Sequence, residues 1–141
     1  MYRLIRFGFL AIIIIFLFSM NSYAAKNNWE SASKSMVWAL KSNNDGLKIS
    51  VLHQIVKYSD SLDVNNAVFD VMRIYRNHPD ERIRHLALIA LHKMGNNWSM
   101  EFLKRRVLFE NNPALYKCIC AILCDYYGYS EPSDTLIAVV K

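Results

Sequence analysis

Residues 80–95 read DERIRHLALIALHKMG and carry the clearest structural pattern in the sequence. The stretch begins with Asp80, whose carboxylate suits the N-cap of a helix, and closes with Gly95, which suits the left-handed residue that ends one. Between them apolar residues recur every three or four positions, so they share one side of a helix. This core stripe consists of Ile83, Leu86, Ala87, Ala90, Leu91 and Met94. The stretch therefore predicts an amphipathic helix that packs on a core.

The same helical spacing continues on both sides of this stretch. Short spacers rich in Asn, Asp, Gly or Pro separate the apolar segments, and no segment alternates with period two for long enough to indicate a strand. Asn112 is placed as another N-cap, Pro113 as a first-turn proline and Gly128 as another helix-ending glycine. The predicted helices span residues 31–43, 46–58, 64–77, 80–94, 98–110 and 113–127.

The sequence also repeats at the scale of a helix pair. A shift of 33 residues aligns Gly95 with Gly128, and a shift of about 36 aligns residues 47–55 with residues 83–91. Two helices recur per unit, with a period in the mid-thirties. A unit of this size cannot bury its own apolar face, so neighbouring units must stack and share a continuous core.

The 80–95 stretch resembles the second helix of a HEAT repeat in its Asp, its aliphatic–Arg pair, its Ala and Leu at core spacing and its closing Gly. The resemblance implies an all-α fold, a right-handed α-α superhelix of about three HEAT-like antiparallel helix pairs. It also implies that Asp80 and Arg84 belong to a polar ladder between neighbouring repeats. The first unit keeps Asp45, whereas the third has Pro113 at the corresponding place. The resemblance is therefore strong only in the central unit, and it indicates a fold rather than an activity.

Beyond Gly128 the 33-residue shift predicts one more helix. Residues from Pro132 to Lys141 read as a short first helix of a fourth unit, a C-terminal capping half-unit that covers the open end of the stack. The run at 136–140 is rich in β-branched residues, so a strand is the alternative prediction for this segment.

The N-terminus carries the features of an export signal. Arg3 and Arg6 precede an apolar run that ends at Met20, and small residues follow up to Ala24. The run is short for a spanning helix, which needs roughly 20 apolar residues, but suits a signal peptide. We therefore expect residues 1–24 to be a signal peptide and residues 25–141 to be an exported, periplasmic or secreted, HEAT-like domain. The alternative is an uncleaved segment that anchors the domain to the membrane.

The composition limits the kinds of partner and of stabilisation. The chain has 17 Lys and Arg against 12 Asp and Glu, but the two signs mostly alternate, which argues against a nucleic-acid partner.

The three cysteines, Cys118, Cys120 and Cys124, lie too close together for a disulfide framework, so the core must stabilise the domain. Cys120 and Cys124 fall on a core stripe, whereas Cys118 does not. Large aromatic residues near helix starts or in a first helix more often fill the core or cover its ends than bind ligands, so we expect Trp29, Trp38 and Trp98 to be buried in this way.

A second stripe on the predicted helices is the candidate binding face. On the 80–94 helix it consists of His85, Ile89 and His92, which lie at i, i+4 and i+7. The resemblance implies that second helices line the concave surface of the stack, and the repeat shifts carry the stripe to the other units. The corresponding residues are Ile49, His53 and Val56 in the first unit and Cys118, Ile122 and Asp125 in the third. The alternative is that these are ordinary, partly exposed positions, with Ile89 and Ile122 covered by neighbouring side chains.

This face is not predicted to hold a metal ion. His85 and His92 are seven residues apart, roughly 10 Å along a helix, which is too far to share one zinc ion. A site formed by His85 with Cys118 is the geometric alternative.

The sequence predicts a binding protein rather than an enzyme. It contains no glycine-rich phosphate loop, nucleophile elbow or His-Glu-x-x-His motif. We expect an extracytoplasmic scaffold or adaptor that binds a protein partner in its concave groove, without a cofactor and without nucleic acid, and that meets a membrane only if the N-terminal segment stays uncleaved. The alternative is an accessory subunit in cofactor or enzyme maturation, as some HEAT-like proteins are lyase subunits.

Overall fold

The computed structural model of the protein describes residues 30–60 and 63–128, and within them the chain is all-helical, with no strand. Its helices confirm the six predicted segments to within a few residues, except that the segment predicted at 64–77 begins as a 3-10 helix and that predicted at 98–110 ends as one. The predicted signal segment at 1–24 and the predicted half-unit at 132–141 lie outside the described residues. The helices, in order, are residues 30–41, α2 (Asp45–Tyr58), α3 (Val68–Asn77), α4 (Glu81–Met94), α5 (Asn97–Arg106) and α6 (Pro113–Tyr127), with 3-10 turns at η1 (Asn65–Ala67) and η2 (Val107–Phe109).

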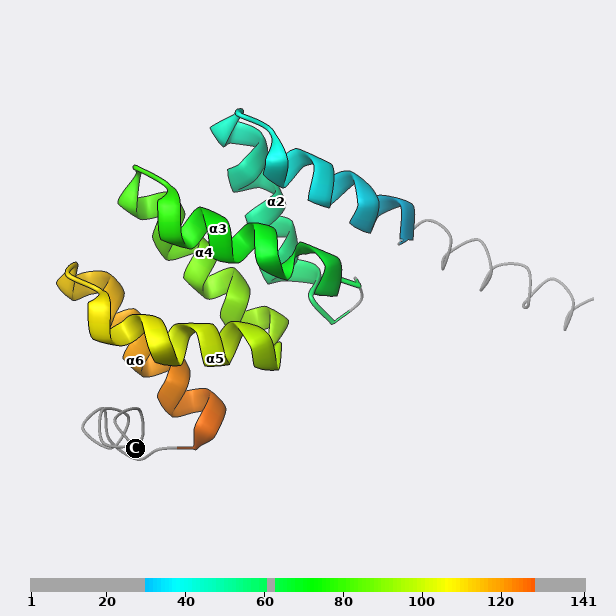
Figure 1. Ribbon diagram of the computed structural model, residues 1–141. Helices are drawn as coiled ribbons and strands as arrows, with labels where there is room; N and C mark the ends of the chain where they lie inside the picture. The colour runs from blue at the N-terminus through cyan, green and yellow to red at the C-terminus, as the bar shows by residue number, and fades with distance from the viewer. Residues whose placement is uncertain (1–29, 61–62, 129–141) are drawn as a thin grey trace, which may run out of the picture.

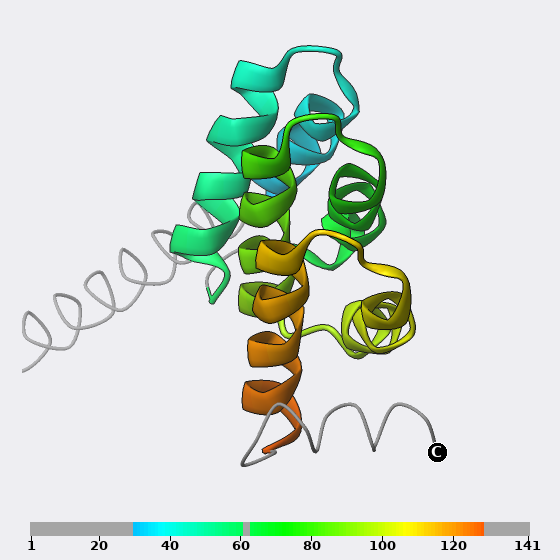
Figure 2. The same ribbon diagram turned by 90° about the vertical axis from the view of Figure 1, so that its left-hand side faces the viewer.

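The helices form two layers (Figures 1 and 2). In Figure 2, α2, α4 and α6 stack one upon the next in an inner layer, and the 30–41 helix, α3 and α5 form the outer layer beside it. Successive helices along the chain alternate between the layers. The inner helix α4 contacts α2 and α6 within its own layer and α3 and α5 in the other. This helix, which carries the opening sequence, is therefore the centre of the described fold.

Side-chain caps fix where the helices begin. Asp80 caps α4 by accepting a hydrogen bond from the N–H of Arg82, and Asn112 caps α6 by accepting from Ala114 and Leu115. Both caps were predicted and are confirmed, as is Pro113 in the first turn of α6. Such a side chain satisfies backbone N–H groups that have no partner within the helix. Asn44 and Asn96 cap α2 and α5 in the same way.

Glycines end α4 and α6, as predicted. Gly95 has φ +57° and Gly128 has φ +71°, both in the left-handed region. The N–H of Gly95 donates to the carbonyl oxygens of Leu91 and His92, which closes the last turn of α4. Only glycine adopts this conformation without steric cost.

Replacing Gly95 with Ala is expected to lower the free energy of unfolding by about 1–2 kcal/mol. A Cβ at this position would meet no atom within 4 Å, so the cost comes from the backbone conformation alone. Urea unfolding followed by circular dichroism measures the change. Gly95→Asn is the control, because Asn tolerates the left-handed region better; equal stability of the Ala and Asn variants would contradict the assignment.

The core lies between the layers and along the inner stack. Predicted core residues Ile83, Ala87, Ala90 and Leu91 are buried, whereas Leu86 and Met94 are half-buried. Leu88, which lies off the predicted stripe, is completely buried. The reason is that α4 has neighbours on several sides, so more than one stripe of it is covered.

The expectation that the tryptophans are buried is wrong for Trp38 and Trp98, and Trp29 lies outside the described residues. Their exposed fractions are 71% and 68%. Both lie on helices of the outer layer, where one side of each helix packs on the inner layer and the opposite side faces outward. None of the helices in the described part of the chain is long and apolar enough to cross a membrane.

Candidate functional site

The best-supported site is a groove between α2 and α4. It has a volume of about 450 Å³ and lies on the inner layer, where the sequence predicted the binding face. Of the nine predicted residues, the structure brings four together here: Ile49 and His53 from α2, and His85 and Ile89 from α4. Its full lining consists of Ile49, His53, Asp80, Arg82, Ile83, His85, Leu86 and Ile89.

Hydrogen bonds at the start of α4 fix one end of this groove. The carboxylate of Asp80 accepts from the backbone N–H of Arg82 at 2.8 Å and from the guanidinium Nη2 of the same residue at 2.9 Å. These bonds, first the side-chain one and then the backbone one, hold the pKa of the Asp80 carboxyl below its ordinary value. Asp80 therefore stays ionised and orients Arg82, whose side chain is 91% exposed.

Sequence reasoning did not include Arg82 or Leu86 in the site. Arg82 lies three residues before His85 and seven before Ile89, so extending the predicted stripe by one turn reaches it. Leu86 was assigned to the core, but it is half-buried and lines the groove. The groove therefore has a wider apolar floor and one more cation than the sequence indicated.

The groove offers two kinds of contact. Ile49, Ile89 and Leu86 present apolar surface, and the rings of His53 and His85, both exposed, stand among them. The Arg82 guanidinium supplies hydrogen-bond donors at the end formed by the α4 cap. Sites of this kind, mostly apolar with a few polar groups, bind amphipathic segments or small ligands.

The predicted residues farther along the inner layer do not line this groove. Val56 is half-buried and packs against the core. His92 Nε2 lies 3.4 Å from Asp125 Oδ2, so these two predicted residues do meet, across α4 and α6. His92 Nδ1 is buried and has no hydrogen-bond partner.

The placement of Ile122 on an accessible face is wrong. Ile122 is only 6% exposed and belongs to the hydrophobic core. The 33-residue shift makes Ile122 the counterpart of Ile89. However, α6 packs on both α4 and α5, so the side chains of α6 are covered on more than one side.

Cys118 is half-buried rather than exposed, and burial raises the pKa of its thiol. Because the thiolate is the reactive form, this burial lowers the reactivity expected of Cys118. Cys120 is buried and carries a free thiol, so it forms no disulfide with Cys124. Within residues 30–60 and 63–128, no three His, Cys, Asp or Glu side chains group in a way that would hold a metal ion.

The side chains of Asp80 and Arg84 make polar contacts, but not with each other. Arg84 Nη2 donates to Glu110 Oε2 at 2.8 Å, which links α4 to the segment before α6. Asp80 binds Arg82 of its own helix, and its backbone N–H donates to His78 Nδ1 at 3.1 Å. The predicted ladder residues therefore connect neighbouring segments through Glu110 and His78, which the sequence did not indicate.

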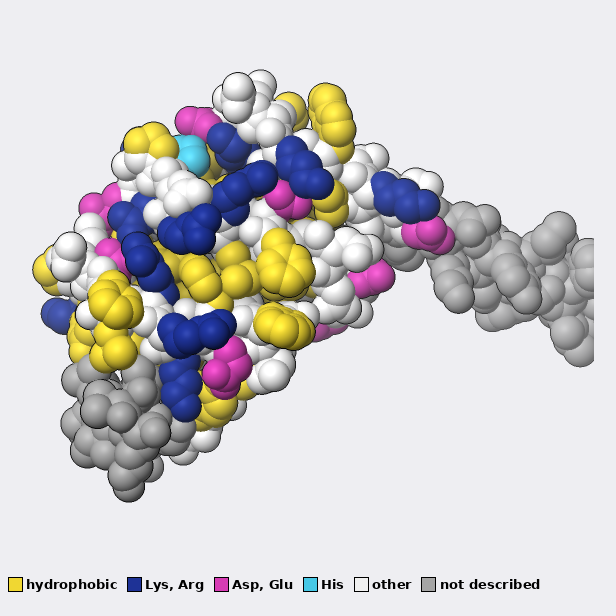
Figure 3. Space-filling view, viewed as in Figure 1, with side chains coloured by type: hydrophobic (Ala, Val, Ile, Leu, Met, Phe, Trp, Pro, Cys, Tyr) yellow, Lys and Arg dark blue, Asp and Glu magenta, His cyan; other side chains and the backbone are white. Residues whose placement is uncertain are grey.

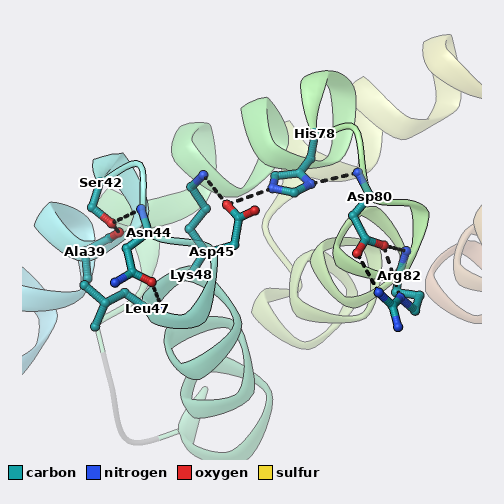
Figure 4. A network of polar contacts seen from close by, with 9 residues as sticks. All are labelled: Ala39, Ser42, Asn44, Asp45, Leu47, Lys48, His78, Asp80 and Arg82. Carbon is teal, nitrogen blue, oxygen red and sulfur yellow. Dashed lines mark hydrogen bonds and ion pairs between the residues drawn. The ribbon is translucent and has the colours of Figure 1, made fainter.

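His78 joins the starts of α2 and α4 (Figure 4). Because its Nδ1 accepts from the N–H of Asp80, its Nε2 carries the proton and donates to Asp45 Oδ1 at 3.1 Å. Asp45 also accepts from Lys48 Nζ at 2.9 Å, and these two bonds, that from Lys48 first, lower the pKa of the Asp45 carboxyl. The chain of contacts ties the two helices that form the groove at their N-terminal ends.

Comparisons of the chain with protein-family models, with curated proteins and with solved structures found no match. The geometry and chemistry of the groove are therefore the basis for a functional assignment.

Proposed function

We propose that this chain is an extracytoplasmic scaffold that binds a segment of a partner protein in the groove between α2 and α4. One observation carries the proposal: Ile49, His53, His85 and Ile89, which the repeat shift places in matching rows of two units, line a single cavity of about 450 Å³. Residues in matching rows of a stacked repeat form an extended surface, which suits a peptide better than a compact ligand.

The lining defines the chemistry of the partner segment. An apolar side chain fits between Ile49 and Ile89, because both present aliphatic surface in a groove that is already partly shielded from water. A carboxylate or carbonyl oxygen of the same segment fits Arg82, which keeps donors free beyond those that Asp80 engages. The preferred segment is therefore amphipathic, with an aliphatic anchor next to an acidic or acceptor group.

The proposal includes the architecture and the compartment. We propose that the described helices are three HEAT-like antiparallel pairs of a short superhelix, supported by the mid-thirties period and by the stacking of α2, α4 and α6 in one layer. We also propose export, supported by Arg3, Arg6 and the apolar run that ends at Met20. The lack of catalytic motifs in the sequence supports binding without catalysis.

Replacing both Ile49 and Ile89 with Glu is expected to abolish capture of the partner. Two carboxylates in the groove would repel an acidic segment. They would also replace the aliphatic surface on which the apolar side chain of that segment packs. The measurement is affinity purification of the tagged chain from cell envelopes, with quantitative mass spectrometry of the recovered proteins. Leu47→Glu is the matched control, since Leu47 is an exposed apolar residue of α2 that lines a different hollow.

A photo-reactive amino acid at position 85 tests directly, by cross-linking, whether the partner lies in the groove. We expect it to cross-link the partner, whereas the same group at Gln54, which lines the hollow on the other side of α2, should not. Unchanged recovery by the double Glu variant, together with equal cross-linking from positions 85 and 54, would refute the groove as the binding site.

A further inference from the structure

Large aromatic side chains stand exposed on the outer layer, away from the groove. Trp38, Phe69, Trp98 and Phe109 have exposed fractions of 71%, 67%, 68% and 68%. They come from the 30–41 helix, from α3, from α5 and from η2. Single exposed apolar residues are ordinary, but a group of large ones on one layer marks an interaction surface.

One side of α5, continued into η2, carries two of these aromatic residues. Trp98, Phe102, Arg105 and Phe109 follow one another at i, i+4, i+7 and i+11, which is the spacing of a single helical stripe. Phe102 is half-buried and the other three are exposed. The stripe therefore mixes aromatic surface with a cation.

The outward sides of α3 and α5 meet at a hollow of about 380 Å³. Its floor is apolar, and two guanidinium groups stand beside it. The hollow is lined by Phe69, Asp70, Met72, Arg73, Arg76 and Phe102. Residues Phe69, Met72, Arg73 and Arg76 are again a single stripe, this time on α3.

The 30–41 helix continues the same surface. Lys41 Nζ lies 3.9 Å from Asp70 Oδ2, and Arg73 Nη2 lies 2.9 Å from Asp70 Oδ1, so the first helix adjoins the α3 stripe. Lys34 and Trp38 are exposed and lie seven and three residues before Lys41. We call the three stripes together the outer face; its residues are Lys34, Trp38, Lys41, Phe69, Met72, Arg73, Arg76, Trp98, Phe102, Arg105 and Phe109.

The outer face is basic. In Figure 3 hydrophobic side chains gather in the middle of this face, and Lys and Arg side chains are spread around them. The acidic residues of the outer-layer helices are already engaged. Glu30 pairs with Lys34, the buried Asp70 pairs with Arg73, and Glu101 accepts a hydrogen bond from the Tyr127 hydroxyl. Lys34, Lys41 and Arg73 are the cations of these ion pairs, and the exposed Arg76 and Arg105, which lie outside them, favour an anionic partner.

We infer that the outer face binds the surface of an anionic phospholipid bilayer. Trp and Phe side chains prefer the boundary between headgroups and acyl chains, and Lys and Arg beside them attract anionic headgroups. The apolar run of the N-terminus ends at Met20, ten residues before residue 30. Where the N-terminal segment stays uncleaved, these ten residues of chain span at most about 35 Å, so a membrane that holds the run lies within reach of the 30–41 helix.

A bilayer suits this face better than a nucleic acid. Proteins that bind single-stranded nucleic acid combine stacked bases with a basic groove that follows the backbone. Here the cations are distributed over a broad layer of three helices, and the hollow between α3 and α5 has an apolar floor. The groove between α2 and α4 belongs to the other layer, so a partner segment and a bilayer can bind at the same time.

Vesicle binding by the full chain tests the inference. We expect more protein to co-sediment with vesicles of phosphatidylcholine and phosphatidylglycerol than with phosphatidylcholine alone, and this preference to fall with salt. The variant R73E/R76E/R105E should bind the anionic vesicles on the order of 100-fold more weakly, because each basic residue near an anionic surface strengthens binding about fivefold. The variant K57E/K93E/K117E changes the net charge equally on the exposed side of the inner layer and should keep the preference.

Tryptophan fluorescence gives a second measurement that needs no charge reversal. With Trp29→Phe, the remaining tryptophans are Trp38 and Trp98, and anionic vesicles should shift their emission to shorter wavelengths and expose them to quenching by brominated lipids. The N-terminal apolar run is common to all variants, so differences between variants report the outer face.

Three results would overturn the inference. The first is an equal loss of vesicle binding by the two triple variants. The second is a Trp38 and Trp98 emission that anionic vesicles leave unchanged. The third is tight binding of a single-stranded oligonucleotide that R73E/R76E/R105E abolishes, with no preference for anionic vesicles.

Discussion

Replacing Glu110 with Ala is expected to lower the free energy of unfolding by about 3–5 kcal/mol, because it leaves the half-buried guanidinium of Arg84 and two further donors without their acceptor. The Glu110 side chain is only 4% exposed and that of Arg84 is 21% exposed. Glu110 Oε2 accepts from the Tyr75 hydroxyl at 2.7 Å and from Arg84 Nη2 at 2.8 Å, and Oε1 accepts from the N–H of Asn112 at 3.1 Å. Removing the carboxylate therefore leaves three donors unsatisfied at the junction of α3, α4 and α6.

Two further variants separate the charge from the hydrogen bonds. Glu110→Gln keeps the shape and one acceptor but removes the charge opposite Arg84, so it should cost less than Glu110→Ala. Tyr75→Phe removes one hydroxyl and leaves the Arg84 pair intact, so it should cost about 0.5–1.5 kcal/mol. Urea unfolding followed by circular dichroism gives the order, and an Ala variant as stable as the Phe variant would contradict the role of the ion pair.

The Glu110 carboxylate also makes the free energy of unfolding depend on pH. Burial alone would raise the pKa of the Glu110 carboxyl, but the hydrogen bonds from Tyr75 and from Asn112, with the charge of Arg84, outweigh burial and hold the pKa below its ordinary value of 4.5. A lowered pKa in the folded state means that the contribution to stability is present above the unfolded pKa and is lost as the pH falls through the folded pKa.

The expected result is that the stability difference between the unaltered chain and Glu110→Gln shrinks as the pH falls below about 4.5. Taking the difference cancels the similar contributions of Asp45 and Asp80, whose pKa values are also lowered. Unfolding free energies measured from neutral pH to pH 3 test this; a difference independent of pH would mean that the Glu110 carboxyl has the same pKa in the folded and unfolded states, which contradicts the lowered pKa. Tyr75 remains a donor throughout, because burial and the hydrogen bond to Glu110 raise the pKa of its hydroxyl.

The helices were predictable because the signals that define them are local. Asp80, Gly95, Asn112 and Gly128 act on backbone groups within one turn of themselves, so the sequence near each position determines where the helix begins or ends. The four groove residues were also predictable, because the repeat shift carries a stripe on α4 to the matching stripe on α2.

The polar partners were not predictable, because they join residues far apart in the sequence. Tyr75 and Glu110 are 35 residues apart, and Glu110 lies between a 3-10 turn and a cap, where no periodicity applies. The contact between Asp45 and His78 spans 33 residues, the same as one repeat shift. That contact joins the first residue of α2 to the loop before α4, and a search limited to helical stripes did not include it.

Helical periodicity also failed to separate the core from the groove on α4. A stripe defined by three- and four-residue spacing has one centre, whereas α4 packs against α3 and α5 on one side and against α2 and α6 on two others. Leu88 faces one of these additional contacts and is completely buried. Leu86, near the centre of the predicted stripe, is only half-buried: it packs against the core and also lines the groove.

Replacing Leu88 with Ala is expected to lower the free energy of unfolding by about 2–5 kcal/mol. The Leu88 side chain is fully buried in a central helix, so the substitution removes apolar contacts and leaves a cavity that the surrounding helices cannot fill without moving. The change in unfolding free energy, measured by urea titration at neutral pH, checks the prediction.

Leu86→Ala is the matched control, since it removes the same atoms from the same helix. Leu86 is half-buried at the groove, so truncating it removes less contact, creates an open depression rather than a closed cavity, and should cost less than Leu88→Ala. If the predicted core stripe were the whole buried surface of α4, Leu86→Ala would cost more than Leu88→Ala, because Leu86 belongs to that stripe and Leu88 does not. The sign of the difference between the two variants therefore decides whether α4 packs on one side, as an isolated amphipathic helix would, or on several, as the central helix of a two-layer stack does.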